Sequence, residues 1–132
     1  MESEPKFVNW VKPDVSHEIG EIERTSKTLG IPIDKIKIAI EKAEIVNLDD
    51  QVWSLLENTD SCDVQSLEDV ARLADQVSRD YKAIAEAYLA GKPMQSPIVI
   101  RHGNTFHLIS GNTRLMVARA LNIAPKVLIC EI

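Results

Sequence analysis

The last third of the chain constrains the fold most, because short apolar segments alternate there with turns and one helix-like stretch. Gly103 and Asn104 form a two-residue signal for a hairpin turn. Ser110 and Gly111 form a tight junction of small residues before the helix-like stretch. The predicted strands are residues 97–101, 105–109 and 126–131, and the predicted helix is 112–121. This order indicates an α+β domain in which the apolar last strand is central or well covered.

The junction that starts this helix is suited to hold an anion. Gly111 permits close approach of the backbone, Asn112 and Thr113 add donors, and Arg114 adds a planar guanidinium. The first N–H groups of a helix have no intrahelical partner, and the helix dipole favours negative charge there. Ser110 to Arg114 are therefore the candidate phosphate contacts, although a plain helix start with Arg114 pointing to solvent fits the same spacing.

Charge is distributed unevenly along the 132 residues, whose net charge is −5. Residues 92–132 hold five Lys or Arg against one Glu, a balance of +4, whereas residues 1–91 carry −9. The potential that attracts anions is thus expected around the candidate site. The acidic first part argues against nonspecific coating of nucleic acid but leaves a local basic groove open.

The rest of the chain predicts mostly helices. Residues 1–15 are expected to be irregular, and Ser16 is a candidate N-cap. The predicted helices are 17–29, 35–42, 50–57 and 67–90, the last broken near Ser78, with an extended segment at 44–48. The alternation in 36–40 also fits a strand. Residues 1–43 are predicted to be a helical N-terminal extension, and residues 44–132 the main domain.

Residues 97–132 resemble the ParB/sulfiredoxin superfamily, in the manner of a stand-alone, phage-type ParB-like domain. Members of ParB type carry a Gly-x-x-Arg box that opens a helix, followed by a Leu-x-x-x-Pro turn into a strand. Gly111 with Arg114, and Leu121 with Pro125, match these features. The resemblance implies a small mixed sheet packed with helices. It also implies that Gly111, Asn112, Thr113 and Arg114 contact the phosphates of a nucleotide or of a phosphorylated intermediate.

The departures from the superfamily pattern narrow the expected activity. Sulfiredoxins place a catalytic Cys in the box, which this chain lacks, so sulfinic-acid reduction is not expected. ParB partition proteins carry a second Arg where this chain has Leu115, and a downstream helix-turn-helix. A DNA-sliding clamp is therefore not expected either. The two cysteines, Cys62 and Cys130, are expected to be isolated thiols in a reducing cytoplasm.

A polar turn over residues 58–61 is the second candidate part of the site, because the anion box, Ser110 to Arg114, contains no acid of its own. Phosphoryl transfer needs a carboxylate that orients a nucleophile or holds Mg²⁺. Asp60 is the first choice for catalysis and for the metal, and Glu57 is the second. Asn58, Thr59 and Ser61 are candidate phosphate contacts beside them. A helix end followed by an ordinary polar turn remains the alternative.

Several other polar residues are weaker candidates. Arg79 is a candidate second phosphate contact, and an exposed helix junction is the alternative. His102 and His107 flank the hairpin turn and are expected to face solvent, since no metal-binding spacing accompanies them. Arg119 points about 140° away from Arg114 on a helical wheel, which favours an ion pair or a partner surface.

The sequence therefore predicts a domain that binds a nucleotide or another phosphorylated ligand. The expected activity is hydrolysis of ATP or another nucleoside triphosphate with Mg²⁺, or phosphotransfer to a small molecule or nucleic acid. Arg114 would neutralise charge on the transferred group. The alternative is a non-catalytic nucleic-acid-binding or adaptor module. No apolar run approaches the roughly 20 residues that cross a bilayer, so no membrane association is expected. The oligomeric state stays open.

Overall fold

A computed structural model of the chain describes residues 8–57, 59, 61, 64, 66, 68–70, 72 and 81–132. The helices are α1 (Ile19–Leu29), α2 (Ile33–Lys42), α3 (Asp50–Leu55), α5 (Tyr81–Leu89) and α6 (Asn112–Ala120), with the 3-10 turn η1 (Val15–Glu18) before α1. The strands are β1 (Trp10–Val11), β2 (Ile45–Asn47), β3 (Leu56–Glu57), β4 (Met94–Gln95), β5 (Ile98–His102), β6 (Thr105–Ser110) and β7 (Lys126–Glu131). The fold is mixed α+β, as the sequence predicts.

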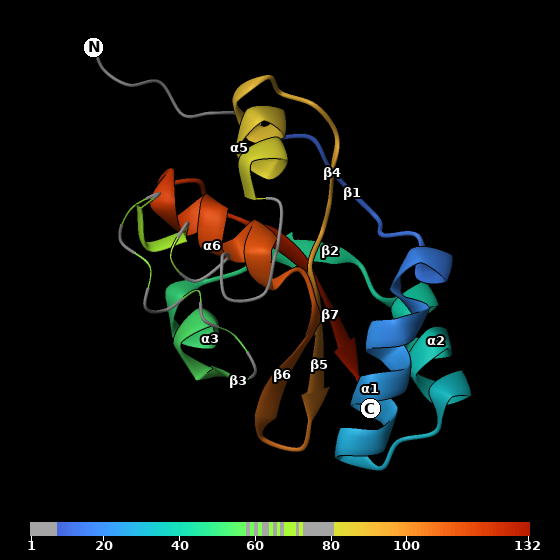
Figure 1. Cartoon of the computed structure of the whole chain (residues 1–132). Coiled ribbons are helices and arrows are strands. Elements are labelled where there is room, and N and C mark those ends of the chain that lie inside the picture. The colour runs from blue at the N-terminus through green and yellow to red at the C-terminus, as the bar shows by residue number, and fades with distance from the viewer. Residues whose placement is uncertain are drawn as a thin grey trace.

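A five-stranded mixed sheet forms the centre of the molecule (Figure 1). Its strand order is β2-β7-β5-β6-β3. β5 and β6 form the predicted antiparallel hairpin, and β7 pairs with β5 in parallel and with β2 antiparallel. β7 is thus an inner strand, which confirms the prediction from its apolar sequence. β1 and β4 pair in parallel as a separate two-stranded sheet.

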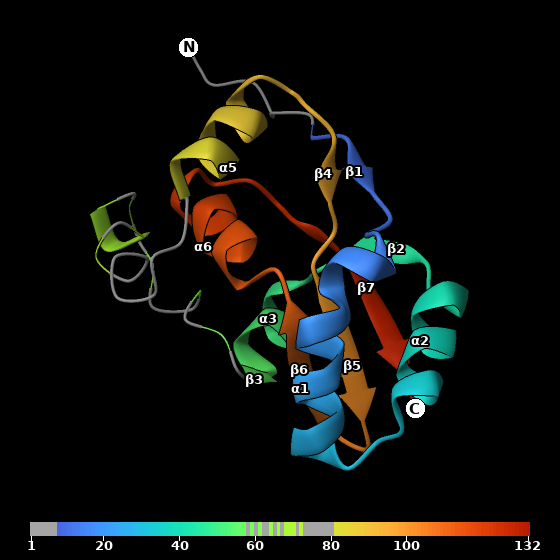
Figure 2. The same ribbon diagram turned by 45° about the vertical axis from the view of Figure 1, so that its right-hand side comes forward.

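Helices cover both faces of the sheet (Figure 2). Successive side chains of a strand point to opposite faces, so each strand contributes to two clusters. Ile98, Ile100 and Leu128 pack with Ile22 of α1 and Ile36 of α2. On the other face, residues 99, 108 and 127 pack with α3 and α6, and α5 packs on the outer side of α6. Burial of these aliphatic side chains supplies most of the stabilisation, at about 25 cal/mol per Å² of apolar area.

Several predicted boundaries are wrong, for local reasons. Asp14, not Ser16, caps the first helical turn, because its carboxylate accepts the Ser16 N–H at 3.0 Å. The second helix begins at Ile33, so the strand alternative for 36–40 is also wrong. The Asp49 carboxylate caps α3, but this helix ends at Leu55 and not at residue 57 as predicted, because the chain turns into β3 beside β6. Within the predicted helix 67–90, the structure places α5 at Tyr81–Leu89, and residues 68–70 and 72 are also helical.

Besides β3, two further strands, β1 and β4, lie where the sequence predicts none. β1 falls in the segment predicted to be irregular, and β4 follows the turn after α5. Each is only two residues long and forms through contacts between distant parts of the chain. Local sequence patterns do not predict such contacts. In the described part of the chain, no helix is long and apolar enough to cross a membrane.

Two titratable side chains lie inside the sheet layers. Cys130 is a free, buried thiol, and burial raises its pKa to about 12, which keeps it protonated. Cys62 lies outside the described residues. His107 is buried on β6, so the prediction that it faces solvent is wrong, whereas His102 is exposed as expected. Burial lowers the pKa of His107, and the Glu57 carboxylate on the paired strand opposes this shift.

We predict that buried His107 makes stability depend on pH. Its pKa is lowered on folding from 6.5, so the unfolded chain binds the proton more readily, and stability falls as pH drops below that value. His107→Gln should flatten the pH dependence of the unfolding free energy between about pH 7.5 and about pH 5.5, measured by urea denaturation. His102→Gln, on the exposed end of β5, is the control. An equally steep curve for His107→Gln would contradict the assignment.

Candidate functional site

The junction between β6 and α6 is built around a close backbone contact. Gly111 has φ of 100° and lies against Pro97, the residue before β5. A Cβ on Gly111 would fall 2.5 Å from Cβ of Pro97. Only glycine satisfies both the positive φ and this lack of space. The Leu115 N–H donates to the Gly111 carbonyl at 2.9 Å, which starts the helix directly after the strand.

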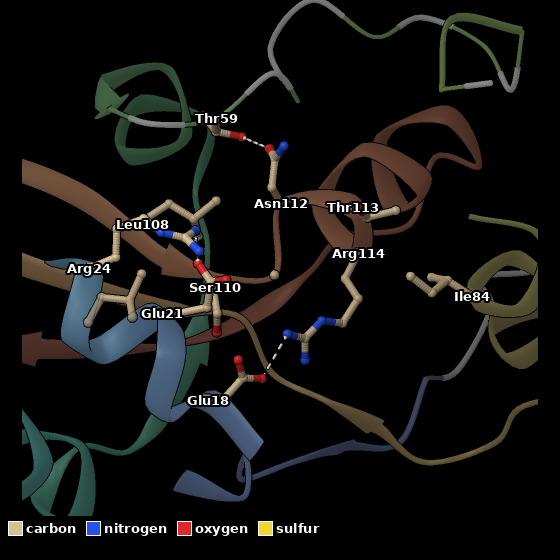
Figure 3. A pocket seen from close by; sticks show the side chains of 12 residues that line it. Glu18, Glu21, Arg24, Thr59, Ile84, Leu108, Ser110, Asn112, Thr113 and Arg114 are labelled. Atoms are coloured by element: carbon tan, nitrogen blue, oxygen red, sulfur yellow. Dashed lines mark hydrogen bonds and ion pairs between the residues drawn. The ribbon is translucent and has the colours of Figure 1, made fainter. Parts of the chain in front are cut away.

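A cavity of about 610 Å³ opens over this junction (Figure 3). Its described walls come from four separate parts of the chain: residues 108–114, Thr59 after β3, Ile84 of α5, and the first helical segment. The polar lining residues are Glu18, Glu21, Arg24, Thr59, Ser110, Asn112, Thr113 and Arg114. The predicted anion box therefore lines a real cavity, and its charged partners come from the N-terminal helix.

Arg114 is held in place at the start of α6. Its Nη1 donates to the Gln95 carbonyl at 2.7 Å, and its Nη2 lies 3.4 Å from Oε1 of Glu18. The two side chains are only 15% and 13% exposed, so the ion pair is shielded from water (Figure 3). The Tyr88 hydroxyl donates to the Arg114 carbonyl at 2.9 Å, and burial raises the pKa of that phenol, which keeps its proton. The solvent-facing alternative for Arg114 is thus wrong.

The Ser110 hydroxyl is the least satisfied polar group of this site. Ser110 is 7% exposed, and its Oγ has no hydrogen-bond partner among the described residues. A buried hydroxyl without a partner costs about 1–3 kcal/mol. Because Ser110 also lines the cavity, a ligand oxygen there could supply the missing bond.

Of the polar segment after β3, the described residue Thr59 reaches the start of α6. Thr59 Oγ1 donates to Oδ1 of Asn112 at 2.7 Å (Figure 3). Ser61 is bonded to Thr59 and lies behind it, outside the cavity lining. Glu57 is exposed in β3 and lies beside His107, not in the cavity. Asn58, Asp60 and Arg79 lie outside the described residues.

The sequence analysis missed the charged residues contributed by α1 and the residue before it. Glu18, Glu21 and Arg24 recur every third residue, which places them on one side of the helix. That spacing is visible in the sequence, but no local signal indicates that this side faces residues 110–114. Arg24 is paired with Glu21 at 2.8 Å. Among the described residues, the cavity lining thus includes two acids beside two bases, whereas the charge distribution predicted a potential that attracts anions.

The basic residues of the last third do not gather in one groove. Arg101 pairs with Glu131 at one end of β7, and Lys126 begins the same strand at the other end. Arg119 lies 4.0 Å over the ring of Trp53, beside a second, smaller cavity of about 250 Å³. The Arg119 Nε is buried without a hydrogen-bond partner among the described residues. Arg119 therefore makes a cation–π contact within the fold, where an ion pair or partner surface was expected.

Comparison with protein-family models, curated proteins and solved structures found no match for this chain.

We predict that Gly111→Ala destabilises the protein more than alanine at another glycine of positive φ. The left-handed backbone costs about 1–2 kcal/mol for alanine, and the clash with Pro97 adds about 1–3 kcal/mol. Gly103→Ala is the matched control, since its φ is +66° but nothing lies within 4 Å of the added Cβ. Urea denaturation should show the difference in unfolding free energy. Equal losses for the two variants would exclude the Pro97 contact as a constraint.

Proposed function

We propose that this protein binds the phosphate groups of a nucleoside triphosphate with Mg²⁺ in the cavity over Gly111. The activity that follows is hydrolysis of the nucleotide, or transfer of its terminal phosphoryl group to a small molecule or nucleic acid. The observation that carries the proposal is the buried Ser110 hydroxyl, which lacks a partner among the described residues and lines the same cavity as Arg114. A buried hydroxyl without a hydrogen-bond partner, near the positively charged Arg114 guanidinium, suits an anionic ligand with several oxygens.

Arg114 and the start of α6 would hold the phosphates. The Gln95 carbonyl fixes the guanidinium at Nη1, which orients the group at little further entropic cost when a ligand binds. Gly111 provides no side-chain cap for α6, and the positive end of the helix dipole favours negative charge at this place. In the reaction, Arg114 would stabilise charge on the transferred phosphoryl group.

Among the described carboxylates, Glu18 and Glu21 rather than Glu57 are best placed to hold Mg²⁺ or to accept a proton. Among the described residues, no cluster of three or more acidic, His or Cys side chains could hold a metal ion. Mg²⁺ in nucleotide sites commonly takes one or two carboxylates and completes its shell with phosphate oxygens and water. The two glutamates fit that donor set. When bound, the metal neutralises phosphate charge, and the second carboxylate is available to accept the proton of an attacking hydroxyl or water.

The chain organisation also supports assignment as a small ParB-like domain of the ParB/sulfiredoxin superfamily. Strand β6, the glycine junction, helix α6 and strand β7 follow in the order that the resemblance implies. The alternative of a nucleic-acid-binding or adaptor module has less support, because the basic side chains of residues 92–132 do not lie together in one groove. A steep fall of DNA or RNA affinity with salt would favour that alternative.

We predict that binding of ATP depends on Mg²⁺ and that Glu18 is the main reason. Without metal, the Glu18 carboxylate repels the phosphates and competes for Arg114. Glu18→Gln should therefore strengthen metal-free ATP binding and reduce the gain from Mg²⁺ by roughly tenfold, measured by calorimetry. Glu23→Gln, an exposed residue of α1 outside the cavity lining, is the control.

Arg114→Gln should weaken binding of Mg·ATP by roughly tenfold or more, because a charge-assisted contact is lost. Its folding is checked by the thermal midpoint, since Arg114 also joins α6 to Gln95. The proposal fails if neither ATP nor CTP binds the wild-type protein with Mg²⁺. Unchanged affinity in a folded Arg114→Gln variant would remove that residue from the site.

A further inference from the structure

A second cavity, of about 250 Å³, lies at the other end of α6 from the anion box. Part of its described lining comes from the last turn of α6 and the segment after it, residues 119 and 122–125. The other part comes from α3 and the segment before it, residues 48, 50 and 53. Both helices lie on the same face of the sheet (Figure 1). No described residue lines both cavities, so this is a separate place in the fold.

Arg119 is the cationic side chain of this second cavity, and it lacks the partners that such a residue commonly has. Lys and Arg at the end of a helix often donate to its last carbonyls. Here the carbonyls of residues 117–119 accept the backbone N–H groups of residues 121–123 instead. Among the described residues, no carboxylate forms an ion pair with Arg119, and no acceptor takes a hydrogen bond from it. The guanidinium charge is therefore without a counterion.

The Arg119 guanidinium is also only partly hydrated. Its Cζ lies 4.0 Å from the centroid of the Trp53 ring, which covers one side of the group. The Arg119 Nε is shielded from water as well. A cation that has lost part of its water and has no counterion gains more from an anion than a fully exposed cation does. Arg101 makes a useful contrast, because it lies over the Phe106 ring but is paired with Glu131.

The rest of the lining restricts the kind of anion. Leu48, Ile123 and Pro125 are buried and form an apolar wall, which the bond from the Leu48 N–H to the Pro125 carbonyl holds together at 3.0 Å. Asp50 also lines the cavity and is exposed, and its negative charge disfavours a ligand that carries two charges. The volume corresponds to about eight water molecules, so the ligand is a compact molecule.

We propose that the second cavity binds a small monocarboxylate with an apolar body. The two carboxylate oxygens accept hydrogen bonds from the terminal amino groups of Arg119, a planar pairing that suits these two groups. The apolar body of the ligand packs against the apolar wall. Contact with the Trp53 ring holds the guanidinium in place before the ligand arrives. The inference is independent of the proposed function, because it uses no residue of the anion box.

An NMR titration at constant ionic strength tests the ligand class, with the indole N–H signal of Trp53 as the reporter. Butyrate should shift this signal to saturation. Its uncharged analogue butyramide and the doubly charged malonate should bind roughly tenfold more weakly or less. The Trp10 signal, which Trp10→Phe identifies, should not respond, since Trp10 lies in β1. Equal affinities for butyrate and butyramide would overturn the carboxylate, and equal affinities for butyrate and malonate would overturn the single charge.

A pair of arginine variants tests the assignment of the site. Arg119→Gln should weaken butyrate binding by roughly tenfold or more, because the charged donors are lost. Arg101→Gln is the matched control, since Arg101 also lies over an aromatic ring but lies outside the cavity. The thermal midpoint shows whether each variant is folded. Equal affinities of the two folded variants would overturn the proposal.

An exposed acid supplies a test that does not depend on how Arg119→Gln folds. Asp50→Asn should raise the affinity for malonate relative to butyrate by roughly threefold, because a repelling charge is removed from the cavity. Asp34→Asn is the control, since Asp34 is an exposed acid in the first turn of α2 and lies outside the cavity. A ratio of affinities that stays the same in the Asp50→Asn variant would contradict the inferred position of the ligand.

The last comparison keeps the two cavities apart. Butyrate binding should be unchanged in a folded Arg114→Gln variant, whether or not the wild-type protein binds ATP. Loss of butyrate binding in that variant would place the carboxylate at the anion box and overturn the proposal.

Discussion

The contact between Gly111 and Pro97 is the constraint on which the rest of the site depends. It brings the end of β6 against the start of β5 so closely that no side chain fits between them. Because α6 begins at the next residue, the same contact decides where the helix starts and where its dipole points. Ser110, Asn112 and Arg114 then take their places around the cavity as a consequence of one backbone turn.

The second requirement is that α1 lies against the sheet. Ile22 and the cluster around it hold this helix on the face formed by β5, β6 and β7. That packing is apolar and has no direct part in chemistry, yet it places Glu18 at the Arg114 guanidinium. The described cavity lining therefore includes side chains of both charge signs, Glu18 and Glu21 with Arg24 and Arg114.

Local patterns predicted the elements of the last third well, and distant contacts explain what they missed. The hairpin at Gly103, the glycine junction and the apolar strand β7 each have a signal within a few residues. No local sequence signal indicates the role of Glu18, because 96 residues separate it from Arg114. The burial of His107 likewise depends on which strand face α1 and α2 cover, and the end of α3 at Leu55 depends on pairing of β3 with β6. These outcomes are tertiary, and periodicity in one segment cannot reveal them.

The place of β7 in the sheet has a consequence for how the protein is made. β7 lies between β2 and β5, although both precede it in the chain. During synthesis each of those strands therefore emerges before its inner neighbour exists, and the face on which α1 and α2 pack lacks Leu128 and Cys130. The N-terminal helices consequently have an incomplete surface to dock on until residues 126–131 are free of the ribosome. Because non-local pairing of this kind is slow, we expect the cavity over Gly111 to form late in folding, after β7 has joined the sheet.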